Sequence, residues 1–187
     1  MKKKIIKGIA AGLAAASLCC TAVAADPTQG MIATAIQLQE EYNLPSGLLL
    51  SVAEVESDFN SDCITGKCKG LMQIHSAYSK EYAEQAGLTD YDLFDPEDSM
   101  RIAASMLAGY IDKYEGDLHY SLMCYNLGEY GAKVKRNNGA ETTGYSRKVI
   151  SKIEKWADIE AEHIADAGNM VSSIKAAVKK WMEDFVK

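Results

Sequence analysis

The sequence predicts a mainly α-helical protein with one compact domain and an extra helix at its C-terminal end. Apolar residues recur at three- and four-residue spacing along most of the chain, which is typical of amphipathic helices. Helix start signals and glycines at helix ends divide this pattern into separate helices. No alternating pattern in the sequence is long enough to predict a useful β-strand. A chain of 187 residues is long enough to bury a core of its own.

The first predicted helix carries an apolar stripe over 31–38 and ends at 43–45, where a proline follows Asn and Leu. The second helix, over 46–57, is apolar on most of its faces, so we expect it to be buried. A polar loop that contains glycines covers 58–69, and a further helix is predicted over 76–86. Together these segments form the N-terminal half of the expected domain.

The later helices have clearer start signals. Asp95 precedes a proline and two acidic residues, a pattern that predicts an N-cap and a favourable first turn. The predicted boundaries run from Asp95 to Gly116, from Asp117 to Gly128, through a short helix that ends at 137–139, and from Tyr145 through Trp156. We expect the domain to cover 26–160 and an amphipathic helical extension to cover 161–187.

The first 25 residues are typical of a secretory signal peptide. A basic start is followed by a small-residue apolar stretch over 8–18 and by Ala22-Val23-Ala24, which matches a cleavage site. The apolar stretch is shorter than the about 20 residues of a membrane-spanning helix. Cys19 and Cys20 lack the pattern of a lipoprotein signal. We therefore predict an exported protein that works in the cell envelope, the periplasm or outside the cell.

The charge of the exported chain excludes some partners. The segment before residue 26 holds four lysines and no acidic residue, so 16 of the 20 Lys and Arg residues remain against 26 Asp and Glu. The resulting net charge of −10 argues against nucleic acid, which requires a basic surface. It also argues against strong adhesion to anionic lipids or wall polymers.

Three cysteines remain after the predicted cleavage. Cys63 and Cys68 lie five residues apart in one short loop, and in an exported protein this spacing favours a disulfide between them. A metal site is the weaker alternative, because no second pair of ligands is present and the histidines are scattered along the chain (His75, His119 and His163). Cys124 is expected to be buried as a small apolar residue.

Glu56 is the strongest candidate for a catalytic group. It stands near the end of the buried helix, where the helix dipole and the apolar surroundings both favour the protonated carboxyl and so raise its pKa. A carboxyl group with a raised pKa is what a general acid for a glycosidic oxygen requires. Glu54 is two positions away and therefore on nearly the opposite helix face. An ordinary exposed glutamate at a helix end remains the alternative.

Other polar and aromatic residues are weak signals when each is taken alone. Ser57 and Asn60 are suited to capping, Phe59 to the core, and a lone Tyr-Asn pair to simple packing. Their order along the chain is more specific. The successive motifs are Glu56-Ser57-x-Phe59-Asn60, Gly70-Leu71-Met72-Gln73-Ile74, Leu93-Phe94-Asp95-Pro96-Glu97, Tyr125-Asn126-x-Gly128 and Glu141-Thr142-x-x-Tyr145.

This series resembles the motifs of the soluble lytic transglycosylase (SLT) domain family over about residues 40–156. The resemblance implies a lysozyme-like fold and Glu56 as the single catalytic acid and base. It places the substrate-binding residues at Ser57, Met72, Gln73, Tyr125, Asn126 and Tyr145. Two departures are visible, because Cys124 and Leu127 stand where the family usually has alanine.

The resemblance also implies a reaction. Glu56 would cleave the bond between N-acetylmuramic acid and N-acetylglucosamine in peptidoglycan without water and leave a 1,6-anhydromuramoyl end. No cofactor and no metal are implied. The expected partner is the glycan strand, acted on by a monomer, and small members of the family often serve a secretion or conjugation machine.

Three other readings stay open from the sequence. A lysozyme-like hydrolase would need a second carboxylate, for which Asp58 and Asp62 are available. The second is a non-catalytic glycan-binding or assembly module, and the third is an accessory that opens the wall for a secretion or conjugation machine.

The tail lies outside the resemblance. We expect Gly168-Asn169 to break the helix there and a last helix to pack on the domain. A partner-binding or membrane-surface helix is the alternative.

Overall fold

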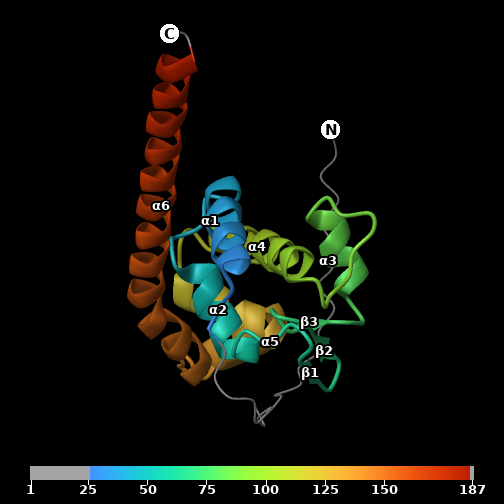
Figure 1. The fold of residues 1–187 in the computed structure, drawn as a ribbon. Coiled ribbons are helices and arrows are strands. Elements are labelled where there is room, and N and C mark those ends of the chain that lie inside the picture. The colour runs from blue at the N-terminus through green and yellow to red at the C-terminus, as the bar shows by residue number, and fades with distance from the viewer. Residues whose placement is uncertain (1–25, 186–187) are drawn as a thin grey trace, which may run out of the picture.

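The computed structural model describes residues 26–185, with side chains as far as residue 176. The predicted signal segment lies outside these residues. The elements are α1 (Gln29–Glu41), α2 (Leu48–Ser57), β1 (Ile64–Thr65), β2 (Cys68–Lys69), β3 (Ile74–His75), α3 (Ser79–Gln85), α4 (Pro96–Lys113), α5 (Leu118–Asn137) and α6 (Gly144–Phe185). The predicted mainly α-helical class is confirmed, and Figure 1 shows α6 on one side of the molecule and α3 with the strands on the other.

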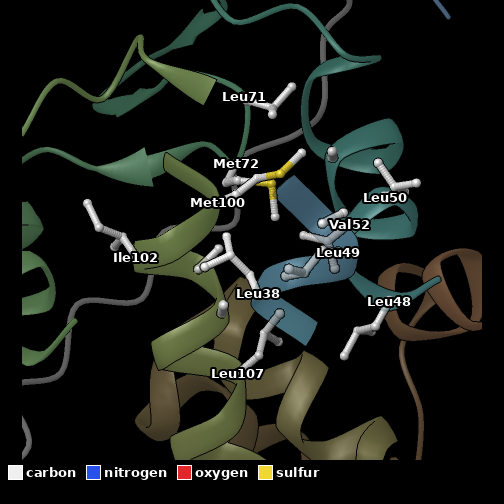
Figure 2. Close-up of a cluster of buried hydrophobic side chains, with 14 of the residues drawn as sticks. Leu38, Leu48, Leu49, Leu50, Val52, Leu71, Met72, Met100, Ile102 and Leu107 are labelled. Atoms are coloured by element: carbon white, nitrogen blue, oxygen red, sulfur yellow. The ribbon is translucent and has the colours of Figure 1, made fainter. Parts of the chain in front are cut away.

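Helix α2 forms the centre of the core. Leu48, Leu49, Leu50 and Val52 are fully buried on it, as its apolar sequence predicts. Figure 2 shows these side chains beside residues from α1, α4 and the segment before β3. The labelled neighbours are Leu38, Leu71, Met72, Met100, Ile102 and Leu107. Because α2 is buried over its first two turns, its last turn carries Glu56 out of the core in one defined direction.

A buried carboxylate fastens α6 to the start of α2. Glu160 is 1% exposed and accepts hydrogen bonds from Gln39 Nε2 at 2.9 Å, Ser46 Oγ at 2.6 Å and the Gly47 backbone N–H at 2.9 Å. Gly47 has a φ of 78° and leaves no room for a side chain, since a Cβ there would lie 2.3 Å from the Ile153 carbonyl oxygen. The contact therefore holds two helices that are distant in sequence at a close approach.

The predicted helix caps are present. Asp95 accepts hydrogen bonds from the backbone N–H groups of Glu97 and Asp98 at 2.9 and 3.0 Å, with Pro96 as the first residue of α4. Asp117 caps α5 through the Tyr120 N–H at 2.9 Å. The chain also breaks at Gly128, whose φ of 69° and ψ of 161° divide α5 into two segments. The predicted helix end at Gly128 is thus confirmed.

The expectation of no useful strand needs correction. Within the predicted polar loop and the segment after it, the two-residue strands β1, β2 and β3 form an antiparallel sheet in that order. Strands of two residues are too short to show alternation, so the sequence pattern could not reveal them. The segment 70–74 leads from β2 to the start of β3 within this sheet.

The prediction for the tail was wrong in two respects. Helix α6 runs without a break through Gly168 to Phe185, and the side chains of 164–176 are exposed instead of packed on the domain. A single glycine costs a helix about 1 kcal/mol, which is too little to end it when both flanks favour helix. In the described part of the chain, no helix is long and apolar enough to cross a membrane.

Candidate active site

Glu56 lies where the end of α2 meets the start of α6. The Tyr145 hydroxyl donates a hydrogen bond of 2.7 Å to Glu56 Oε1, across 89 positions of sequence. Both side chains are partly buried, and Tyr145 is the second residue of α6. The structure therefore brings together two of the residues that the sequence predicts for the site.

The surroundings of Glu56 favour its protonated form. Burial raises the pKa of Glu56 to about 7, against smaller opposing contributions from the Tyr145 hydrogen bond and the Lys148 charge. Burial and the negative charge of Glu56 also raise the pKa of Tyr145 and Tyr125 well above the usual range, so both hydroxyls keep their protons. Near neutral pH, Glu56 can thus give up a proton and take one back.

Glu54 serves a structural role on the opposite face of α2. It accepts hydrogen bonds from Lys152 Nζ at 2.7 Å and Trp156 Nε1 at 2.6 Å. Burial alone would raise its pKa, but these hydrogen bonds and the nearby lysines outweigh burial and leave the pKa of Glu54 below its usual value. The two glutamates therefore have opposite pKa shifts, as their different faces predict.

The segment 70–74 is hydrogen-bonded to Ser57, the residue after Glu56, and to Tyr125 of α5. Gly70 has a φ of 76°, and a Cβ at this position would lie 1.6 Å from the Leu93 carbonyl oxygen, so only glycine fits. The Ser57 hydroxyl donates a 2.7 Å hydrogen bond to the Leu71 carbonyl, and the Tyr125 hydroxyl donates a 2.8 Å hydrogen bond to the Met72 carbonyl. These bonds fix the segment between α2 and α5.

Gln73 carries an unused acceptor. Its Nε2 donates hydrogen bonds to the carbonyl oxygens of Gly70 at 2.9 Å and Cys63 at 3.0 Å. Its Oε1 is buried, and none of the described residues donates a hydrogen bond to it. Because buried polar atoms are nearly always paired, this oxygen is a natural acceptor for an N–H or O–H group of a ligand.

The six predicted binding residues differ in their access to solvent. Tyr125 and Tyr145 are partly exposed and Asn126 is exposed, whereas Ser57, Met72 and Gln73 are buried, with Met72 fully so. The hydroxyl of Ser57 and the backbone of Met72 are used in positioning the segment 70–74. In this structure, Ser57 and Met72 therefore shape the site more than they line it.

Some residues that act on the site were not predicted from the sequence. Ser99 on α4 accepts a 3.1 Å hydrogen bond from the Met72 backbone N–H, and Lys148 acts on Glu56 through its charge. Burial, together with the charge of Glu56, raises the pKa of the Cys68 thiol. Lys148 is one helical turn after Tyr145, so helical spacing from that residue could have indicated it.

The predicted bridge between Cys63 and Cys68 is not formed in this structure, in which both residues are thiols. The hairpin register explains this. Cys68 lies opposite Thr65, while the carbonyl oxygen of Cys63 accepts a hydrogen bond from Gly70 at 2.9 Å. The two cysteines are thus diagonal neighbours, and diagonal pairs lie about 7–8 Å apart, beyond the usual Cα separation of a disulfide.

In the described residues, no group of three or more His, Cys, Asp or Glu side chains is placed to hold a metal ion.

Cys124 is buried, as predicted, and Phe59 is buried against Trp156 with ring centroids 5.0 Å apart. Both residues therefore belong to the packing around the site.

A comparison with known families identifies this arrangement. The family model of the transglycosylase SLT domain matches residues 33–148, which is more than half of the chain. The chain belongs to this SLT family. The matched region begins in α1 and ends just after Tyr145, so it contains all the residues of the site described above. The projecting part of α6 lies outside it.

Two known proteins share part of this sequence. The chain is 33% identical over 101 residues to Protein IpgF of Shigella flexneri and, equally, of Shigella sonnei. Each match covers 51% of this chain and 66% of the relative, so the chain spans just under two thirds of their length.

Among solved structures, the lytic transglycosylase Slt of Pseudomonas aeruginosa, solved as an inactive mutant, has a similar fold. The TM-score is 0.58 at 20% identity, over 71% of this chain and 24% of that one. This likeness supports the predicted lysozyme-like fold.

Proposed function

We propose that this protein is a peptidoglycan lytic transglycosylase in which Glu56 is the single acid and base. The observation that carries the proposal is the partly buried Glu56 carboxyl with a pKa of about 7, hydrogen-bonded to Tyr145. Membership of the SLT family and the lytic transglycosylase fold support the same reaction.

In the first step, protonated Glu56 gives its proton to the oxygen between N-acetylmuramic acid and N-acetylglucosamine, and the bond from this oxygen to C1 breaks. The N-acetyl group of the muramoyl residue stabilises the positive charge that develops at C1. Tyr145 holds Oε1 in place, since the Tyr145 hydroxyl is itself a proton donor to that oxygen. The other oxygen of Glu56, Oε2, then carries the proton that is given to the substrate.

In the second step, the ionised Glu56 takes the proton of the C6 hydroxyl while that oxygen bonds to C1. The product is a 1,6-anhydromuramoyl end, and Glu56 returns to its protonated form. One carboxyl used in both steps needs no second acid, whereas a hydrolase does.

The substrate is proposed to lie against Tyr125, Asn126 and Tyr145, with Gln73 Oε1 as an acceptor for one of its N–H or O–H groups. Aromatic rings and amides are suited to binding a saccharide. The unpaired buried oxygen of Gln73 is the observation that supports a polar contact at this point.

The products released from purified peptidoglycan test the proposal. Mass spectrometry of the muropeptides is expected to find anhydro ends, which are lighter by one water than hydrolysed ends. The Glu56→Gln variant should release none of them. Reducing ends with the unchanged protein would instead show a hydrolase, and release by neither protein would favour the binding module.

We expect the rate to fall as the pH rises through about 7, the pKa of Glu56. The first step needs a protonated carboxyl, and above the pKa each further pH unit removes about nine tenths of the protonated form. Rates of anhydromuropeptide release from pH 5 to 9 would check this, since pH 5 and pH 9 lie about two units on either side. A rate that rises from pH 7 to 9 would contradict the assignment.

The place of action is proposed to be the cell envelope. The substrate is part of the wall, and the sequence of the first 25 residues is typical of an export signal. Service to a secretion or conjugation machine is a further proposal, which rests on the family resemblance alone.

A further inference from the structure

The residue after Tyr145 at the start of α6 is a buried serine with several hydrogen-bond partners. Ser146 is fully buried. Its hydroxyl oxygen lies 3.0 Å from His119 Nδ1, accepts a 3.0 Å hydrogen bond from the Thr143 backbone N–H and lies 3.2 Å from the Thr143 carbonyl oxygen. The backbone N–H of Ser146 donates to Thr143 Oγ1 at 3.2 Å. These contacts close the first turn of α6 and join it to α5.

His119 is bonded to Ser146 in every protonation state of the imidazole. The Ser146 hydroxyl has one proton, which can go to the Thr143 carbonyl or to His119 Nδ1. In the first case Nδ1 carries a proton and donates it to Ser146, and in the second Nδ1 accepts. A charged imidazole donates as in the first case. The contact between α5 and α6 therefore persists when His119 gains or loses its charge.

Tyr145 depends on the placement of this first turn. Helix ends fray because their terminal backbone groups lack partners within the helix. The Tyr145 hydroxyl lies at the far end of a long side chain and has to reach Glu56 Oε1 on α2, 2.7 Å away. A small rotation of the turn would lengthen this bond. The contacts of Thr143 and Ser146 hold the turn on both sides of Tyr145.

Helix α5 gives this turn a fixed neighbour. Its first turn carries His119 and is capped by Asp117 through the Tyr120 N–H. The same helix carries Tyr125, whose hydroxyl donates a 2.8 Å hydrogen bond to the Met72 carbonyl. The bond from His119 to α6 thus ties the start of α6 to the helix that holds the segment 70–74.

We propose that His119 is a positioning residue, which holds the first turn of α6 through Ser146 so that the Tyr145 hydroxyl stays on Glu56. His119 acts through Ser146 and Tyr145 and is assigned no contact with the substrate. Where it concerns the reaction rate, this inference rests on the proposed function. Where it concerns the bond between Tyr145 and Glu56, it does not.

The titration of Glu56 tests the proposal without a measurement of activity. In protein labelled with ¹³C at the glutamate carboxyl groups, comparison with Glu56→Gln identifies the NMR signal of Glu56. The Tyr145 hydrogen bond lowers the pKa of Glu56, so a looser bond is expected to raise it. Both His119→Ala and Ser146→Ala should therefore move the Glu56 titration to higher pH.

A histidine elsewhere on α6 provides the matched control. His163 Nδ1 lies 2.8 Å from Gln29 Oε1 and is about 27 Å along the helix from Tyr145. His163→Ala should leave the Glu56 titration unchanged. His119→Asn should restore it, because asparagine carries its amide on Cγ, where histidine carries Nδ1, and can donate or accept a hydrogen bond.

The Tyr145→Phe background separates positioning from other effects. Lys148 of α6, Tyr125 of α5 and Cys68 of β2 also interact with the charge of Glu56, and none of them is substituted in these variants. Without the Tyr145 hydroxyl, His119→Ala should move the titration no further. An equal further shift would mean that His119 acts through Lys148 or through general stability, and it would overturn the proposal.

Rates of anhydromuropeptide release at about pH 5.5, where Glu56 is protonated, complete the test. His119→Ala should lower the maximal rate about 2- to 10-fold, the equivalent of one hydrogen bond, and should have no effect in the Tyr145→Phe background. A Glu56 titration that is unchanged in both His119→Ala and Ser146→Ala would overturn the proposal. A shifted titration with no muropeptides released, even by the unchanged protein, would support the positioning role and refute the proposed function.

Discussion

Replacement of Glu56 by Gln is expected to abolish measurable turnover on peptidoglycan. Gln keeps the shape of the side chain and can still accept the 2.7 Å hydrogen bond from Tyr145, but it can neither give nor take a proton. A general acid and base contributes about 10²–10⁴-fold to a rate, and here one group serves both steps, so we expect a loss of about 10³-fold or more. The rate of anhydromuropeptide release measures this.

Glu54→Gln is the matched control for activity, because Glu54 lies two positions away and binds Lys152 and Trp156 on another face. It should keep turnover within a few fold while it lowers stability. Loss of turnover in Glu54→Gln with turnover kept in Glu56→Gln would reverse the assignment of the two glutamates.

The stability of Glu56→Gln relative to the unchanged protein is expected to depend on pH. The pKa of Glu56 is about 7 in the folded protein against an ordinary value of 4.5, so the folded state holds this proton more tightly. Stability therefore falls as the pH rises from 4.5 to about 7, by up to about 3 kcal/mol at 1.36 kcal/mol per pH unit. Gln removes this cost, so thermal unfolding should show the variant to be more stable than the unchanged protein at pH 8 and similar to it at pH 4. A loss of stability at pH 8 would contradict the raised pKa.

Replacement of Glu160 by Ala is expected to cause a large loss of stability. The buried carboxylate accepts from Gln39, Ser46 and Gly47, so its removal leaves three donors and a void between α6 and α2. Removal of one partner from a buried, charged hydrogen-bonded group costs about 3–5 kcal/mol. For a domain of this size, that corresponds to a drop of about 10–15 °C in Tm.

Thermal unfolding followed by circular dichroism checks this, with Glu162→Ala as the control. Glu162 is an exposed glutamate on the same helix, and its substitution should change stability by less than about 0.5 kcal/mol. Equal Tm values for the two variants would show that the Glu160 contacts contribute little. Because Glu160 lies about four turns along α6 from Tyr145, turnover below the unfolding temperature should persist.

The helices and the candidate acid could be predicted from local patterns, whereas the binding residues were indicated only by the family resemblance. Asp95 and Asp117 were recognisable as caps, and the apolar run of α2 as a buried helix, because both depend on neighbours within a few positions. The position of Glu56 at the end of that helix also predicted the direction of its pKa shift. The β-strands and the course of α6 through Gly168 were missed, since two-residue strands and one glycine leave too weak a local signal.

The contacts that complete the site were decided only by the tertiary structure. The hydrogen bond between Tyr145 and Glu56 spans 89 positions, and the bond between Ser46 and Glu160 spans 114. The sequence by itself determined the helical class, the order of the elements and the candidate acid, because the residues responsible are close together along the chain. Which partners meet across the fold depends on how helices pack, and side-chain burial and pairing follow from that packing.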